Sequence, residues 1–227
     1  MVISHRSLSG TILALMLATA AQAVGPRADT GTTSVEDYVR RFESSYRNVR
    51  TLQADFTQTY VLGGRSRTES GKVYFERGGR MRWDYERPQR KLFVSDGKHL
   101  ILFVPAEEQV TRSSVKSSED FRVPFRLLLS RLNLRKVFSH FEFSDDALQH
   151  EASVRVIRAY PKKEYEQDYR EVLLALSPEF DIRQLQIIYA DHSRMEFKFA
   201  DIRRNVPLQP SLFHFTPPPD VEVIDQR

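Results

Sequence analysis

The sequence contains no cysteine among its 227 residues. This absence excludes disulfide bonds, thiolate metal ligands, a cysteine nucleophile and a lipid anchor attached through cysteine. Glycine (9) and proline (11) are too few for a collagen-like or low-complexity chain. Hydrophobic residues make up 41% of the sequence, which favours a folded protein with a full core over a disordered chain.

The sequence also has no large excess of charge of one sign. The 34 basic and 30 acidic side chains leave a formal net charge of only +4, and the two signs are interleaved. The most charged run, residues 162–171, mixes both signs and predicts a solvated hairpin loop. A nucleic-acid surface needs a patch of one sign with exposed aromatic side chains, so we predict no nucleic-acid partner.

Motifs for catalysis are missing as well. The sequence has no P-loop, no G-x-G-x-x-G, no G-x-S-x-G and no H-E-x-x-H. Its six histidines are scattered singly, without the spacing of metal ligands. The adjacent acids Glu107-Glu108 and Asp145-Asp146 fall in expected loops, where solvated carboxylates are the simpler interpretation than an acid–base pair. We therefore predict no enzyme, no metal and no cofactor.

The N-terminus has the pattern of a secretory signal peptide. Arg6 is followed by an apolar stretch over residues 12–18 and by the small-x-small site Ala21-Gln22-Ala23. The apolar stretch is shorter than the ~20 residues of a membrane-spanning helix, which makes an N-terminal anchor the weaker alternative. The sequence predicts a signal peptide over residues 1–23 and one exported domain over residues 24–227, free in a bacterial periplasm.

The mature chain begins with a helix signal. Ser34 and Asp37 form a capping box, and apolar residues follow at helical spacing. This stripe consists of Val35, Tyr38, Val39, Phe42, Tyr46, Val49 and Leu52. The opposite side is charged, so we expect an amphipathic helix that lies against another element.

Beyond this helix the hydrophobic period changes to two. Residues 80–86 and 194–199 alternate strictly between apolar and charged side chains. Further strands are predicted at residues 55–60, 72–77, 92–95, 100–104, 137–143, 154–160, 172–176, 185–189 and 212–215. Short turns separate them, which favours eleven strands in one long antiparallel meander.

One segment departs from this alternation. Residues 112–136 contain Pro124, a residue suited to the first turn of a helix, followed by Phe125 and a leucine-rich run. We predict that this segment is helical and that, with the N-terminal helix, it covers the apolar face of the sheet.

Arg77 stands out within the predicted strands. Counting by two places Val73, Phe75 and Arg77 on one face, so a cation ends an apolar row. The carbonyl oxygens at the C-terminal end of a covering helix would accept its hydrogen bonds. The alternative is that the guanidinium extends into solvent beside the Gly78-Gly79 turn.

Several segments, in this order, resemble a known family. They are LQADFTQ at 52–58, GKVYFER at 71–77, RWDY at 82–85 with Pro88, VSDGK at 94–98, EQV at 108–110, FHFTPPPDVEV at 213–223 and DQR at 225–227. Together they are similar to the LolA family of periplasmic outer-membrane lipoprotein carriers. The sequence departs from the family pattern at Gly78, where the family usually has a proline.

The resemblance implies a mainly β fold: an incomplete, strongly curved antiparallel barrel with a helical lid over an apolar cavity. It also implies a soluble periplasmic carrier that binds the acyl chains of lipoproteins. The expected partners are these lipoproteins, an inner-membrane ABC transporter that releases them and an outer-membrane receptor of the LolB type. A shuttle of this kind is most simply a monomer. In the family, an arginine at the position of Arg77 bonds to the lid and keeps it closed.

On this basis we expect a lipid-binding cavity and a lid with a latch. The expected cavity residues are Phe75, Met81, Trp83, Leu102, Met195 and Phe197. The expected lid residues are Phe125, Leu128 and Leu129, with Arg77 as the latch. The alternative for each apolar residue is an ordinary core position. The alternatives for function are a binder of another lipid or an envelope-stress sensor with the same fold, and lastly a hydrolase using scattered carboxylates.

Overall fold

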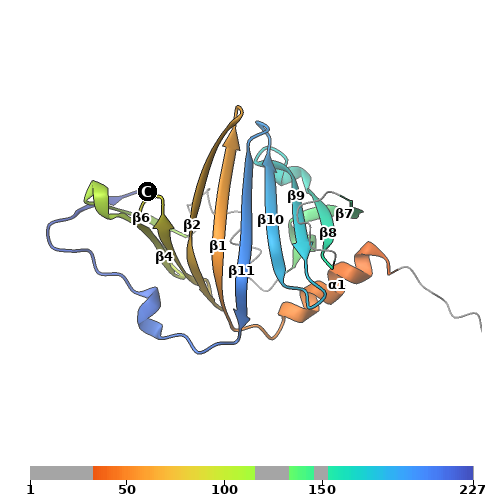
Figure 1. Ribbon diagram of the computed structural model, residues 1–227, viewed down its shortest axis with the longest axis horizontal. Helices are drawn as coiled ribbons and strands as arrows, with labels where there is room; N and C mark the ends of the chain where they lie inside the picture. The colour runs from red at the N-terminus through yellow and green to blue at the C-terminus, as the bar shows by residue number, and fades with distance from the viewer. Residues whose placement is uncertain (1–32, 116–132, 146–152, 227) are drawn as a thin grey trace, which may run out of the picture. The chain divides into compact units, whose positions relative to one another are not determined.

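The computed structural model describes residues 33–115, 133–145 and 153–226. They belong to one compact unit, Thr33–Arg227. Within the described residues the fold consists of one α-helix, a twelve-stranded sheet and short 3-10 turns (Figure 1). The mainly β fold expected from the alternating sequence is confirmed.

The helix α1 spans Val35–Tyr46 and begins where the capping box predicts. The Ser34 side chain accepts a hydrogen bond of 3.1 Å from the backbone N–H of Asp37. The helix ends earlier than the predicted stripe, because the backbone is soon held to the sheet: the N–H of Arg50 bonds to the Asn205 side chain at 2.8 Å. Leu52, the last residue of that stripe, therefore lies in the first strand.

The strands are β1 (Thr51–Leu62), β2 (Arg65–Glu76), β3 (Arg80–Arg87), β4 (Lys91–Asp96), β5 (His99–Val104), β6 (Gln109–Ser114), β7 (Phe138–Ser144), β8 (Arg155–Pro161), β9 (Tyr169–Leu176), β10 (Ile182–Tyr189), β11 (Arg194–Arg204) and β12 (Glu222–Asp225). Their order in the sheet is β12-β6-β5-β4-β3-β2-β1-β11-β10-β9-β8-β7. The outermost strands, β12 and β7, do not close on each other, so the curved sheet is an incomplete barrel.

This order corrects the single meander expected from the sequence. Two antiparallel meanders, β1–β6 and β7–β11, join through the pairing of β1 with β11, in which Phe56 lies opposite Phe199. The last strand, β12, pairs with β6 in parallel. Neither β6 nor β12 was predicted, and the strand expected at residues 212–215 is wrong, because the 3-10 turn η4 (Pro210–Phe213) extends into it. The other predicted strands coincide with strands of the sheet.

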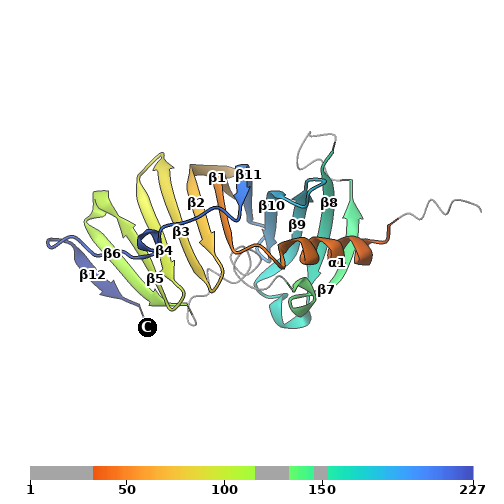
Figure 2. The same ribbon diagram turned by 90° about the horizontal axis from the view of Figure 1, so that it is seen from below.

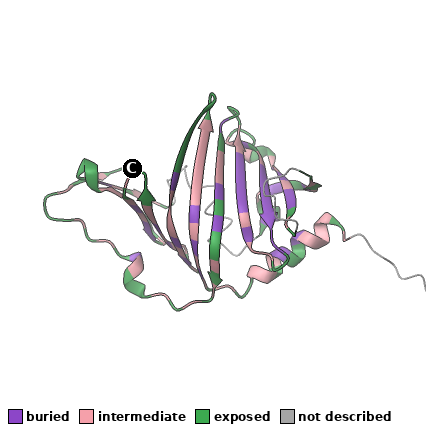
Figure 3. Ribbon diagram, in the orientation of Figure 1, coloured by how far each residue is buried: buried purple, intermediate pink, exposed green. Residues whose placement is uncertain are grey.

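The main core lies on one face of the sheet, which we call the inner face; Phe56, Trp83 and Leu174 are on it. A smaller buried cluster, separate from it, consists of Val156, Leu173 and Ala175. Buried positions are dense on β8, β9 and β10 (Figure 3). Helix α1 runs across these strands (Figure 2) and buries Val39 and Phe42 against the same core cluster. The amphipathic helix thus packs on the apolar sheet face that its stripe requires.

The opposite, outer face carries the chain that links β11 to β12. Along this link, η4 contacts β3 and β4, and Phe213 is 1% exposed. The guanidinium of Arg82 donates to the carbonyl oxygen of Leu212 at 3.2 Å, and the ring centroids of Phe103 and Phe215 lie 5.2 Å apart. The link is therefore held to the outer face by both polar and aromatic contacts.

Candidate functional site

The inner face carries a cluster of aromatic rings around Trp83, which is fully buried. The Trp83 ring centroid lies 4.7 Å from that of Phe56 and 5.6 Å from those of Phe75 and Phe197. The first two pairs meet edge to face, the geometry that the ring quadrupoles favour. The cluster forms a continuous apolar surface across β1, β2, β3 and β11.

Strand register explains why these rings meet. Residues directly opposite one another in paired antiparallel strands point to the same face. Trp83 lies opposite Val73 of β2 and Phe93 of β4. Because every second residue of a strand points to the same face, the apolar residues of each strand form a row on the inner face.

The six cavity residues expected from the sequence all lie on this inner face. Phe75, Met81, Trp83 and Phe197 are buried, whereas Leu102 and Met195 are intermediate in exposure. Phe75 lies opposite Met81, and Leu102 lies opposite Phe93. The structure thus places them on one face, and their part in lining a cavity and binding lipid stays a prediction.

The cavity residues expected from the sequence leave out other aromatic residues of this face, among them Phe56, Tyr85 and Phe199. The signal was present, because Phe56 alternates with polar residues and Phe199 ends the apolar row that begins at Met195. Membership of one cluster follows only from the pairing of β1 with β11.

Arg77 contacts the C-terminal end of α1. Its guanidinium donates to the carbonyl oxygen of Arg47, the C-cap residue, and its backbone N–H donates to the carbonyl oxygen of Arg50 at 2.8 Å. The residue is also exposed. Both interpretations offered by the sequence therefore describe part of its environment: it reaches a helix carbonyl and keeps contact with water.

The residues predicted for the lid, Phe125, Leu128 and Leu129, lie outside the described residues.

Gly78, which follows Arg77, has a φ of +103°. Proline is restricted to a φ near −65°, so the proline usual in the family cannot adopt this backbone conformation.

Arg204 supports the same end of α1 from β11. Its guanidinium donates to the carbonyl oxygen of Phe180 and pairs with Asp181, each at 2.6 Å. It also lies 4.5 Å from the ring centroid of Tyr46, the last residue of α1. Burial raises the pKa of Tyr46 to about 12, so this phenol stays neutral at physiological pH. Two arginines from different parts of the sheet thus hold the end of α1.

A buried polar cluster, which no sequence motif indicated, adjoins the aromatic rings. Glu69 is 6% exposed and accepts hydrogen bonds of 2.7 Å from both Lys91 and Arg67. The Lys91 ammonium lies 4.1 Å from the ring centroid of Tyr85, and the Tyr85 hydroxyl donates to the Gln58 side-chain oxygen at 2.8 Å. Burial, reinforced by the charge of Glu69, raises the pKa of Tyr85.

The structure also has a cavity of about 640 Å³ near the turn between β3 and β4. Its lining residues are Arg82, Asp84, Tyr85, Glu86, Arg87, Arg90, Lys91, Leu92, Phe103, Pro105 and Phe215. Charged side chains make up more than half of this lining, so the cavity lacks the apolar walls that acyl chains require.

The described part of the chain holds no group of three side chains that could together bind a metal ion. Nor does it contain a helix that is long and apolar enough to cross a membrane.

Comparisons with known proteins agree with this architecture. The family model described as "Outer membrane lipoprotein carrier protein LolA" matches residues 47–216. The chain is 32% identical to an outer-membrane lipoprotein carrier protein of Nitrosospira multiformis over 81% of this chain and 86% of that protein. It is also 32% identical to one of Methylococcus capsulatus, over 82% of this chain and 87% of that protein.

Among solved structures, an uncharacterized conserved protein from Thermus thermophilus is similar in fold, with a TM-score of 0.54 and 11% identity. The similarity covers 85% of this chain and 99% of that one. The open curved sheet, the aromatic inner face and these sequence matches lead to one conclusion: the chain belongs to the LolA family of outer-membrane lipoprotein carrier proteins.

Proposed function

We propose that this protein carries acylated lipoproteins through the periplasm. It receives them from an inner-membrane ABC transporter and delivers them to an outer-membrane receptor of the LolB type. The observation that carries the proposal is the continuous aromatic surface around Trp83 on an open sheet. Membership of the carrier family supports it. The protein acts by binding rather than by catalysis.

The proposed location follows from the N-terminus. Residues 1–23 have the charged, apolar and small-residue pattern of a signal peptide, and the sequence has no cysteine for a lipid anchor. Cleavage after Ala23 releases a mature chain that begins at Val24.

Apolar burial supplies the binding energy for the cargo. Each buried methylene contributes ~0.8 kcal/mol, so a chain of about 14 methylenes contributes ~11 kcal/mol. Three such chains would exceed the ~18–21 kcal/mol ceiling of non-covalent binding. Full burial would also make delivery too slow. Part of the gain must therefore be offset within the protein.

A covering element that opens provides this offset. Helix α1 buries Val39 and Phe42 against the inner-face core. We place Phe125, Leu128 and Leu129 in the second part of the same lid. Acyl chains that enter replace lid contacts on the inner face. The net binding free energy is therefore the free energy of the acyl-chain contacts minus that of the lid contacts they replace. A small difference permits onward transfer.

The test is a release assay. The mature chain from Val24 is added to spheroplasts that synthesise a labelled outer-membrane lipoprotein, and the soluble fraction is examined for a one-to-one complex. Met195→Asp places a charge on the inner face, whereas Lys198→Asp changes an exposed residue of the same strand. We expect the complex with the wild type and with Lys198→Asp, and much less with Met195→Asp.

Thermal unfolding of each variant shows whether a lost complex is caused by lost binding or by lost folding. Absence of a complex with the wild type contradicts the proposal. If fluorescent acyl probes still bind in that case, the ligand is another lipid.

A further inference from the structure

On two neighbouring strands, β1 and β2, the inner face changes from apolar to polar side chains within two residues. On β1 the buried sequence Leu52, Ala54, Phe56 is followed by Gln58 on the same face. On β2, Val73 and Gly71 are followed by Glu69 in the same way. Two residues of strand span about 6.6 Å, so the polar cluster begins one ring length beyond the aromatic rings.

The ion pair in this polar cluster is weak evidence for a stabilising role. Removing Glu69 and Lys91 from water carries a desolvation cost that their attraction often only offsets. Both side chains are largely shielded, with 7% and 20% of their surface exposed, while Arg67 remains 63% exposed. A function that needs a fixed, partly shielded donor beside an apolar surface explains the arrangement better.

The cluster contains hydrogen-bond donors beyond those its internal bonds use. The Gln58 oxygen accepts from the Tyr85 hydroxyl, which orients the side-chain amide. No hydrogen bond from the NH₂ group of Gln58 is present within the described parts of the chain. Lys91 has three N–H donors, of which one bonds to Glu69.

We infer that this cluster recognises the polar linkage of the acylated cargo. The carbonyl oxygens of its two glyceryl esters accept hydrogen bonds from Gln58 and Lys91 while the hydrocarbon lies on the rings of Phe56 and Trp83. Glu69 is a positioning residue that holds Lys91. The inference rests on the proposed function and deepens it, because it fixes which end of the apolar face receives the polar end of the ligand.

Charge favours a neutral carbonyl over an anionic headgroup. The carboxylate of Glu69 offsets the charge of Lys91 at 2.7 Å, and the exposed Arg67 is screened by water. Gln58 contributes donors without charge. Neutral acceptors with apolar tails match this set of groups.

The test compares two ligands that differ only in these carbonyl groups. One is a peptide with a palmitoylated, dipalmitoylglyceryl N-terminal cysteine; the other has both glyceryl esters replaced by ethers. Each displaces a fluorescent fatty acid from the mature protein. We expect the wild type to bind the diester about tenfold more tightly than the diether, since hydrogen bonds to the ester carbonyls are lost in the ether.

The variants locate this preference. Gln58→Leu combined with Tyr85→Phe removes both partners of one hydrogen bond and leaves the Glu69–Lys91 pair in place. We expect its preference for the diester to fall severalfold, since Lys91 remains as the second donor. Tyr85→Phe alone keeps the Gln58 amide and retains most of the preference. Phe75→Leu, on the apolar surface, weakens both ligands and leaves their ratio unchanged.

Glu69→Gln separates positioning from folding. It frees Lys91 from its anion, so the diester preference falls severalfold while diether affinity changes little; thermal unfolding measures the separate cost of leaving the Lys91 charge unpaired. Equal affinity of the wild type for both ligands, or a full preference in the Gln58→Leu/Tyr85→Phe variant, overturns the inference. Failure of both lipopeptides to displace the probe instead removes the proposed carrier function, and this inference with it.

Discussion

The guanidinium of Arg77 donates a hydrogen bond to the carbonyl oxygen of Arg47, thirty residues earlier in the chain. Arg47 caps the C-terminal end of α1, where unpaired carbonyl groups concentrate negative charge. The cation thus complements the helix end while its backbone N–H holds Arg50 of the following linker. This contact lies at the junction of α1 and β1, where the helix joins the sheet.

Arg77→Leu tests whether this contact acts as a latch. Removing the guanidinium destabilises the closed, empty form and leaves the aromatic surface intact. We expect the variant to form the lipoprotein complex as the wild type does but to transfer it severalfold more slowly to receptor-containing membranes, because closure no longer favours release. Transfer is measured from a purified complex with labelled lipoprotein.

Arg203→Leu is the matched control for Arg77→Leu, since Arg203 is an exposed arginine at the end of β11. It should transfer lipoprotein at the wild-type rate. Normal transfer by Arg77→Leu would remove the latch role and leave the hydrogen bond as a local structural contact.

Gly71 is required by close packing between strands. It lies between Phe56 of β1 and Tyr85 of β3, whose ring centroids lie 5.0 Å apart across it. A Cβ atom at Gly71 would lie 1.9 Å from the carbonyl oxygen of Asp84, a backbone atom. We expect Gly71→Ala to lower the free energy of unfolding by ~3 kcal/mol or more. Urea unfolding measures the change.

Gly63→Ala provides the comparison for Gly71→Ala. Gly63 has a φ of +55° but open space around its Cβ position, so the cost is ~1 kcal/mol from backbone strain alone. Equal costs at the two glycines would contradict the packing argument.

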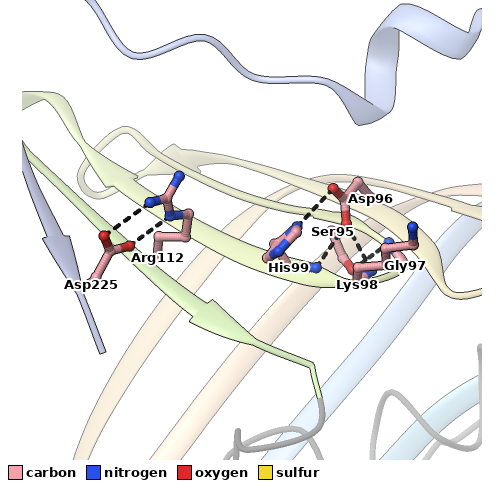
Figure 4. A network of polar contacts seen from close by, with 7 residues as sticks. All are labelled: Ser95, Asp96, Gly97, Lys98, His99, Arg112 and Asp225. Carbon is pink, nitrogen blue, oxygen red and sulfur yellow. Dashed lines mark hydrogen bonds and ion pairs between the residues drawn. The ribbon is translucent and has the colours of Figure 1, made fainter. Parts of the chain in front are cut away.

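The hydrogen bonds that Asp96 accepts (Figure 4) lead us to expect a loss of stability at acidic pH. Burial alone would raise its pKa, but hydrogen bonds from the backbone N–H groups of His99 and Lys98 and from the His99 ring lower it from 3.8 to about 2. A carboxyl with a depressed folded-state pKa stabilises the fold above its ordinary pKa. This contribution is lost as the pH falls from 3.8 toward about 2.

The measurement is urea unfolding of the wild type and Asp96→Asn at about pH 5, pH 3 and pH 2. The wild type should be more stable at about pH 5, and the difference should shrink as the pH falls. A difference that does not change over this range would show that the carboxylate of Asp96 contributes nothing through its charge.

Much of the local structure was predictable from the sequence because its causes are local. The capping box located the start of α1 at Ser34, and strict alternation located β3 and β11. Counting by two placed Phe75, Trp83 and Phe197 on inward-facing rows. The helix carbonyl beside Arg77 was one of the two environments that follow from the cost of ending an apolar row with an unpaired cation.

Tertiary structure decided what alternation leaves open. A period of two says which face a side chain joins, but not which strand lies beside it. The pairing of β1 with β11 brings Phe56 to Phe199, and the parallel addition of β12 to β6 follows from the path of residues 205–221 over the outer face. The polar cluster of Glu69, Lys91 and Gln58 has no sequence motif, because separate strands supply it and only their register makes the groups neighbours.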